Sequence, residues 1–250
     1  MKDSRLHSSL AALVLAIGVV VPRTSQACGS SGPDGVSACS LADYEDAQRP
    51  RWRLGISGVY TATVIRFSST LQTGETRFAS VAELAYSPTS RLTLSAGLGG
   101  AAAGKLLAPD GAHDFSPGLV ASLGVSYRLL DGKTPLGRGF LVTSGLVSIT
   151  ASSTQRADEG PSTAYDALDL RAGLAGGFTW LRMLSAYGVV RAFGGPVYWA
   201  YGGESQLGTD THHYQAGGGL ALLLAKRLDL FVEGVPLGEQ AIAAGAAMNF

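Results

Sequence analysis

The chain has 250 residues, and its 19 Lys and Arg balance 19 Asp and Glu, so the formal net charge at pH 7 is zero. This balance gives no electrostatic case for binding nucleic acid, which proteins recognise through an excess of basic side chains. Charged residues make up only 15% of the chain, while 34 residues are glycine. That is too little charge for the surface of an ordinary water-soluble β protein.

The N-terminus has the pattern of a secretory signal. Lys2 and Arg5 precede an apolar run at residues 10–21, and small residues suited to signal-peptidase cleavage follow it. The run is shorter than the roughly 20 residues of a membrane-spanning helix. We therefore expect residues 1–27 to be a signal peptide and the mature chain to begin near Cys28.

Two cysteines, Cys28 and Cys39, flank a segment rich in Gly, Ser and Pro that has no helical or strand period. After export the compartment is oxidising, so a small disulfide loop is the favoured interpretation, and closing it would contribute roughly 3 kcal/mol. Lipidation of Cys28 is the alternative, although Ser25 stands where a lipobox usually has Leu, and a metal site ranks third. Residues 28–50 are interpreted as a periplasmic N-terminal segment.

Residues 51–250 contain no long helical pattern and break into short runs in which apolar and small polar residues alternate. This is the period of a β-strand with one apolar face. In one run, for example, Leu119 and Leu123 alternate with Ser122 and Ser126. We count ten runs, at residues 52–67, 76–86, 91–98, 119–128, 140–151, 164–180, 184–197 and 214–224, with two more between 228 and 250.

The last run ends the chain on Phe250. In its first half Leu230 and Val232 alternate with Asp229 and Glu233, and alternation continues up to the terminal aromatic. This stretch resembles the C-terminal strand of Gram-negative outer-membrane β-barrel proteins, in which a terminal Phe is a signal for the barrel-assembly machinery. The resemblance implies an outer-membrane location, with partners in the assembly machinery, the outer-membrane lipid and lipopolysaccharide.

The connections alternate in length, as expected for short periplasmic turns and longer outer loops. SPTS and AKR are short, whereas residues 105–114 and 202–213 are longer and polar. Aromatic residues fall at strand ends in two groups, as interfacial belts require. The periplasmic group is Trp52, Tyr86, Tyr127, Phe140, Trp180 and Phe250, and the outer group is Phe67, Phe78, Phe115, Tyr198, Trp199 and Tyr201.

These patterns predict an all-β fold, a transmembrane antiparallel up-and-down β-barrel over residues 51–250. At about 9–11 residues per crossing strand, ten strands fit comfortably, and eight or twelve are also accommodated. A soluble lipocalin-like barrel or sandwich would alternate as well. Its polar face would need charge, however, and the apolar band found here would aggregate in water.

Charged residues of the runs fall on the more polar face and are predicted to line the lumen. This set is Arg53, Arg77, Glu83, Arg91, Arg128, Asp169, Arg171, Asp229 and Glu233, with Arg191 as a further candidate. Opposite charges in a confined interior must pair or be hydrated. Salt bridges that fill the barrel are the leading interpretation, because barrels of this size are usually filled by their own side chains. A charged constriction that selects small solutes is the alternative.

A second candidate site is the loop cluster of Glu204, Asp210, His212 and His213. Omptin-type outer-membrane proteases carry acids and histidines at the outer rim, but we find no paired Asp on a facing strand. Lipid-modifying enzymes of this membrane need a Ser and His pair, and His113 has no serine partner at a readable spacing. A solvated polar loop is the more common outcome, so we expect no catalytic residue, metal or cofactor.

The predicted function is that of a non-enzymatic outer-membrane protein, either structural or a narrow solute pathway. The alternatives are a rim-sited hydrolase that uses His212 or His213, and a surface ligand-binding or adhesion barrel.

Overall fold

The computed structural model describes residues 51–156, 162–181, 183–225 and 227–250. The predicted signal peptide and the predicted segment 28–50, with its Cys28–Cys39 disulfide, lie outside the described residues. No helix in the described part of the chain is long and apolar enough to cross a membrane.

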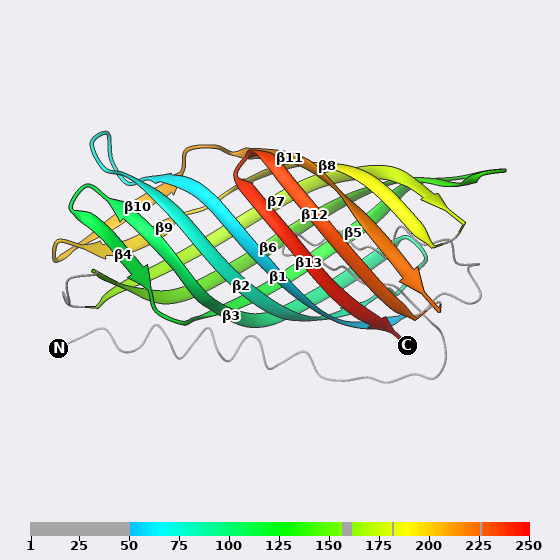
Figure 1. The fold of residues 1–250 in the computed structure, drawn as a ribbon, viewed down its shortest axis with the longest axis horizontal. Helices are drawn as coiled ribbons and strands as arrows, with labels where there is room; N and C mark the ends of the chain where they lie inside the picture. The colour runs from blue at the N-terminus through cyan, green and yellow to red at the C-terminus, as the bar shows by residue number, and fades with distance from the viewer. Residues whose placement is uncertain (1–50, 157–161, 182, 226) are drawn as a thin grey trace.

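The described strands form one antiparallel sheet that closes on itself (Figure 1). They are β1 (Trp52–Arg66), β2 (Gln72–Tyr86), β3 (Leu92–Ala108), β4 (Gly111–Phe115), β5 (Gly118–Thr134), β6 (Gly137–Arg156), β7 (Thr163–Trp180), β8 (Leu184–Gly194), β9 (Val197–Tyr201), β10 (Glu204–Asp210), β11 (Tyr214–Leu224), β12 (Leu228–Gly238) and β13 (Gln240–Asn249). The ring closes because β13 pairs with β1 from Asn249 and Arg53 to Gln240 and Ala62. The prediction of an all-β up-and-down barrel is confirmed.

The thirteen strands occupy ten positions around the wall, which we call staves, because three staves are each built from two consecutive strands. β4 continues into β5 across Ser116 and Pro117, β8 into β9 across Gly195 and Pro196, and β10 into β11 across residues 211–213. Proline has no N–H to give to a sheet ladder, and both prolines lie where the ladder is interrupted. The ten staves correspond to the ten predicted runs.

The ring narrows toward its outer end. The β12–β13 hairpin turns at residues 238–240, and beyond this turn β10 pairs directly with β1 through Asp210 with Ile65 and Thr209 with Arg66. The wall there has eight strands: β4, β9, β10 and the outer ends of β1, β2, β3, β6 and β7. We call this eight-stranded part the collar; it lies at the opposite end of Figure 1 from the C-terminus.

Three segments predicted as connections are largely strand. Residues 105–114 form most of the β3–β4 hairpin, residues 130–137 complete the β5–β6 hairpin, and residues 202–213 contain β10. Their polarity suggested solvated loops, but their backbones pair, as Lys105 does with Asp114. A barrel that extends past the membrane can carry polar residues on both faces of its wall. A polar composition therefore does not distinguish strand from loop there, and the prediction of loops in these segments was wrong.

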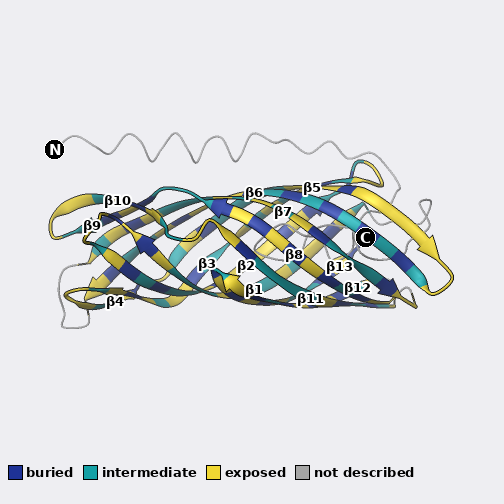
Figure 2. Ribbon diagram, turned by 90° about the horizontal axis from the view of Figure 1, so that it is seen from above, coloured by how far each residue is buried: buried dark blue, intermediate teal, exposed yellow. Residues whose placement is uncertain are grey.

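The outer face of the ten-stave part is apolar. Ile56, Leu119, Leu123 and Ile242 are each more than half exposed on it, and exposed residues alternate with buried ones along the strands (Figure 2). In hydrocarbon this face is stable, because the closed ring satisfies the backbone N–H and C=O groups of the wall internally. The collar exposes many polar residues, among them Arg66, Gln72, Lys105, Asp114 and Asp166, beside a few apolar ones such as Leu107 and Leu207. It therefore projects beyond the membrane.

The predicted aromatic belt forms at the periplasmic end and only in part at the outer end. Aromatics exposed or half-buried at the periplasmic end are Trp52, Tyr86, Tyr127, Trp180 and Phe250. Phe140, predicted to join them, is buried in the lumen, and three aromatics predicted for the outer belt, Phe67, Phe115 and Trp199, are buried inside the collar. Position along the chain was right for these four residues, but they face inward.

Candidate functional site

The predicted lumen charges can now be located in the barrel. Arg53, Glu83, Arg128, Asp229 and Glu233 are buried on the inner wall. Arg77, Asp169 and Arg171 are also turned inward, with side chains 21%, 24% and 11% exposed. Arg91 does not join them. It is exposed in the turn before β3, which begins only at Leu92.

The periplasmic end of the lumen holds two ion-pair groups. Arg53 Nε lies 3.6 Å from Asp229 Oδ2, and Asn249 Nδ2 donates to the same oxygen at 3.1 Å. In the β5–β6 hairpin Asp131 accepts from Arg128 Nη1 at 2.9 Å and also from Arg138.

Asp131 lies beyond the periplasmic aromatic belt. Burial alone would raise the pKa of its carboxyl, but the hydrogen bonds and charges of Arg138 and Arg128 outweigh burial and hold the pKa below its ordinary value. The sequence analysis missed Asp131 and Arg138 because their segment was taken for a loop.

The middle of the lumen is mostly apolar. Buried residues that fill it include Val59, Val81, Val142, Val189, Phe231 and Val235. An ion pair lies within this layer, between strands that flank β11: Arg191 Nη2 donates to Glu233 Oε1 at 2.8 Å, and Tyr187 donates its hydroxyl to Glu233 Oε2 at 3.0 Å. Two hydrogen bonds from β8 therefore hold the carboxylate of β12, as a buried charge requires.

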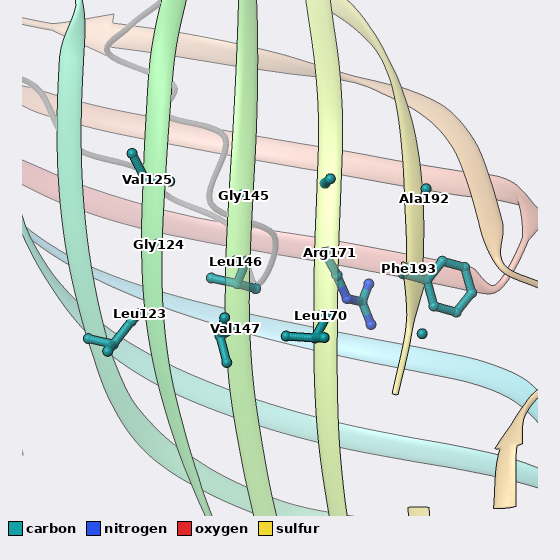
Figure 3. A pocket seen from close by; sticks show the side chains of 12 residues that line it. Leu123, Gly124, Val125, Gly145, Leu146, Val147, Leu170, Arg171, Ala192 and Phe193 are labelled. Carbon is teal, nitrogen blue, oxygen red and sulfur yellow. The ribbon is translucent and has the colours of Figure 1, made fainter. Parts of the chain in front are cut away.

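A charged layer lies where ten staves give way to eight, and we call it the junction layer. Arg171 lies between two acids, with Nε 2.5 Å from Asp169 Oδ2 and Nη2 3.0 Å from Glu239 Oε2. Its guanidinium carbon is 5.3 Å from the ring centroid of Phe193 (Figure 3). Glu239 comes from the β12–β13 turn, so this pair joins that turn to β7 across β8 and β11.

Tyr165 and Glu75 connect opposite walls of the collar. Tyr165 of β7 donates its buried hydroxyl to Glu75 of β2, and Arg77 Nε lies 3.5 Å from the same carboxylate. In the eight-stranded ring β2 and β7 are four strands apart in either direction. One hydrogen bond thus spans the collar at this level.

An apolar cluster fills the collar, and we call it the plug. It consists of Ile65, Phe67, Leu106, Phe115, Tyr165, Val197 and Trp199. Trp199 is fully buried, and its Nε1 donates to Thr154 Oγ1 at 2.9 Å.

Aromatic rings surround the Trp199 indole. Tyr201 stacks on it at 4.4 Å between ring centroids, and Phe67 lies at 5.5 Å. His113, expected in a loop, belongs to β4 and meets the indole edge-on at 5.2 Å. Its Nε2 is 3.1 Å from Asp110 Oδ1. The rings and this polar pair thus pack together inside the collar.

The predicted rim cluster is not assembled into one site. Glu204 begins β10 and Asp210 ends it, so the strand separates them by roughly 20 Å at about 3.3 Å per residue. Asp210 accepts from Thr63 Oγ1 at 3.0 Å, whereas His212 is exposed. Among the described residues no group of three or more His, Cys, Asp or Glu could hold a metal ion.

A cavity of about 730 Å³ lies along β5, β6, β7 and β8 (Figure 3). Leu123, Val147 and Leu170 line it from the outer face, and Arg171 and Phe193 from the lumen face. Its surface is therefore mostly that of a lipid-facing wall. The one charged group it contains is already held by two carboxylates, so the cavity offers nothing resembling a catalytic set.

Gln215 is the most unusual polar residue of the lumen. Its side chain is 1% exposed, and neither its amide oxygen nor its amide nitrogen has a hydrogen-bond partner in the described part of the chain. It pairs in register with Arg191 on one side and Gly238 on the other. It lies directly below the β12–β13 turn.

Sequence reasoning missed Gln215, Glu75 and Glu239. Glu75 could have been found, because counting back by two from the inward-facing Arg77 reaches it. Glu239 carried no such signal, because it belongs to a turn whose inward direction depends on the fold.

The closed ring and the apolar outer face of its ten-stave part define the class of protein. The chain is an outer-membrane β-barrel protein, and its ten-stave part spans the membrane. No protein-family model matches the sequence, and no curated protein matches it.

Three solved structures illustrate the similarity in fold. The outer membrane protease OmpT from Escherichia coli has a TM-score of 0.49 and 12% identity, and the match covers 80% of this chain and 97% of that chain. The translocator domain of the autotransporter NalP from Neisseria meningitidis has a TM-score of 0.43 and 12% identity, with 82% of this chain and 90% of that chain covered. The outer membrane protein OprG from Pseudomonas aeruginosa has a TM-score of 0.39 and 11% identity, with 80% of this chain and 96% of that chain covered. Similarity at this level assigns no activity to this chain.

Proposed function

We propose that this protein is a non-enzymatic, structural outer-membrane barrel whose charged lumen is filled by side chains and closed along its axis. The observation that carries the proposal is the Tyr165–Glu75 hydrogen bond across the collar, with the plug packed around it. An eight-stranded barrel is just wide enough for its own side chains to fill. Narrowing the wall from ten staves to eight is therefore an effective way to seal it.

Single-channel current across a planar lipid bilayer tests this proposal, using the refolded mature protein from Cys28 onward. We expect a folded protein that is electrically silent. Discrete current steps from the unmodified protein would contradict the closed lumen.

A narrow solute pathway is the second candidate, and Gln215 favours it. A buried amide without a partner costs on the order of 1–3 kcal/mol unless water or a solute satisfies it, so the lumen beside it is suited to hydration. The double variant Phe67→Ala, Trp199→Ala, which thins the plug, separates the candidates. If the lumen is a solute pathway, we expect small ion-selective current steps that change when Arg128→Gln or Glu233→Gln is added. If the barrel is purely structural, we expect no current.

We further propose the outer-membrane lipid, lipopolysaccharide and the barrel-assembly machinery as partners. The apolar outer face suits the lipid. Phe250 suits the machinery, because its ring is exposed while its N–H donates to Trp52 O at 2.9 Å. Replacing Phe250 by Ser is expected to reduce the amount of assembled barrel in the membrane without changing expression. An unchanged amount of assembled barrel in this variant would show that Phe250 is not the assembly signal.

The separated rim residues give the hydrolase alternative no support. The double variant His212→Ala, His213→Ala is accordingly expected to leave every measured property of the barrel unchanged. Loss of an activity in that variant would restore the hydrolase alternative.

A further inference from the structure

A groove of about 620 Å³ lies on the collar, at the end of the barrel opposite the C-terminus (Figure 1). Its sides are the β1–β2 turn and the joint between β8 and β9, and β10 lies between them in the sheet. The groove opens on the outer face of the wall, because Arg66, Leu207 and Thr209, which line it, are exposed there. Paired strands therefore hold its shape.

The polar side chains of the groove suit an anion. Arg66 and Thr209 are paired in register on the outer face, and His213 lines the groove with them. No Asp or Glu is among the described residues that line it. Asp210, which follows Thr209, turns inward and accepts from Thr63 Oγ1 at 3.0 Å.

The two basic side chains are available to a ligand. Neither Arg66 nor His213 forms an ion pair within the described ranges. A guanidinium presents its N–H donors in a fork that matches phosphate oxygens, and an imidazole donates a hydrogen bond in either charge state. The hydroxyls of Ser69 and Thr209 add two more donors at the same groove. Phosphate is the anion that fits this set.

Glycines at the β8–β9 joint leave space for the imidazole. A Cβ on Gly194 would lie 3.1 Å from His213 Nδ1, and a Cβ on Gly195 would lie 1.8 Å from Leu168 O. Because this side of the groove is bare backbone packed against β7, His213 can lie beside it.

The remainder of the lining is apolar and continues into the wall that faces lipid. Leu207 lines the groove beside Arg66. Val64 is exposed two residues before Arg66, on the same face of β1, and Tyr214, which follows His213, is 62% exposed. A free phosphate ion would leave this apolar surface in water, whereas a phosphorylated lipid covers it.

We propose that this groove binds the phosphate group of a phosphorylated lipid in the outer leaflet, with the acyl chains running down the wall past Val64 and Tyr214. The inference rests on the proposed function, which names lipopolysaccharide as a partner, and it assigns the contact. Lipid A, the phosphorylated anchor of lipopolysaccharide, has this chemistry. Arg66 binds its phosphate oxygens, and His213 donates a further hydrogen bond.

Native mass spectrometry tests the groove, using the mature protein refolded in detergent and titrated with lipid A. We expect the double variant Arg66→Gln, His213→Gln to bind lipid A at least about tenfold more weakly than the unmodified barrel, because it loses charge-assisted hydrogen bonds to phosphate. An unchanged affinity would overturn the proposal. If the double variant fails to refold, judged by circular dichroism, Arg66→Gln alone carries the same expectation and the same refutation.

Two controls show what is recognised. Lys105→Gln removes an exposed positive charge elsewhere on the collar and should leave the affinity unchanged. An equal loss in this variant would mean that general electrostatic attraction, and not the groove, holds the lipid. Lipid A from which the phosphates have been removed should bind the unmodified barrel at least about tenfold more weakly than intact lipid A. Equally tight binding would contradict recognition of phosphate.

Inorganic phosphate in large excess separates the two sources of this chemistry. We expect it to leave lipid A bound, since the acyl chains contribute to the affinity. Displacement would assign the groove to free phosphate and overturn the lipid as its ligand. An unmodified barrel that binds no lipid A would contradict both the groove and lipopolysaccharide as a partner, whereas equal binding by the double variant would contradict the groove alone.

Discussion

The plug offers the sharpest test of how the outer end is closed, through Trp199→Ala. The indole is fully buried, stacks on Tyr201 and contacts Phe67 and His113. Truncating a buried aromatic to alanine costs about 3–5 kcal/mol, and loss of the hydrogen bond to Thr154 Oγ1 contributes about 1 kcal/mol more. We expect a total near the upper end of that range.

Urea unfolding in lipid vesicles measures this loss, with Trp52 and Trp180 as fluorescent reporters. Trp199→Phe is the matched control, because it keeps a ring in the plug and removes chiefly the indole N–H. It should cost about 1–2 kcal/mol, through the lost hydrogen bond and the smaller ring. A loss below about 1 kcal/mol for Trp199→Ala would refute the view that the plug is a tightly packed core.

Three further changes probe the charged lumen. Glu233→Ala should destabilise the barrel by about 3–5 kcal/mol, since it removes the carboxylate that the buried Arg191 binds, whereas Glu233→Leu with Arg191→Met should cost far less. Equal losses in urea unfolding would contradict this expectation. The lowered pKa of Asp131 means that its contribution is complete above the unfolded pKa and is lost as pH falls through the lower folded pKa. Asp131→Asn should therefore remove part of the acid sensitivity seen in unfolding midpoints between pH 7 and 3, an effect below about 1 kcal/mol because the pair is partly solvated. Gln215→Leu should stabilise the barrel by about 1–3 kcal/mol, because it removes a buried amide without a partner in the described part of the chain; a destabilised variant would indicate that water satisfies this amide.

The membrane-spanning wall could be predicted from the sequence because it follows one rule throughout. Alternation of apolar and polar residues with period two sets which side chains meet lipid, and it correctly turned Ile56 outward and Glu233 inward. Ten runs gave ten staves for the same reason. The inward charges follow from this parity as well, apart from Arg91, where the strand had not yet begun.

The collar could not be predicted in the same way, because outside the membrane the rule no longer holds. Both wall faces of residues 105–114 and 202–213 are mixed, so composition could not distinguish strand from loop. Aromatic residues were assigned to a lipid belt by position alone. Trp199 and Phe115 are buried more completely inside the narrow collar than they would be on its outer face. Other residues therefore face outward at this level.

The two parts of the barrel fill their interiors by different means, and ring size explains the difference. Eight strands enclose a space that side chains can fill, and in the collar large apolar rings pack around the Tyr165–Glu75 hydrogen bond. Ten strands enclose more, and there Arg and Glu side chains pair along the inner wall, as Arg191 of β8 and Glu233 of β12 do across β11. The junction layer lies between a wide lumen that contains buried ion pairs and a narrow collar that apolar rings fill. Unpaired polar atoms such as those of Gln215 are expected at such a boundary, where neither way of filling the space is complete.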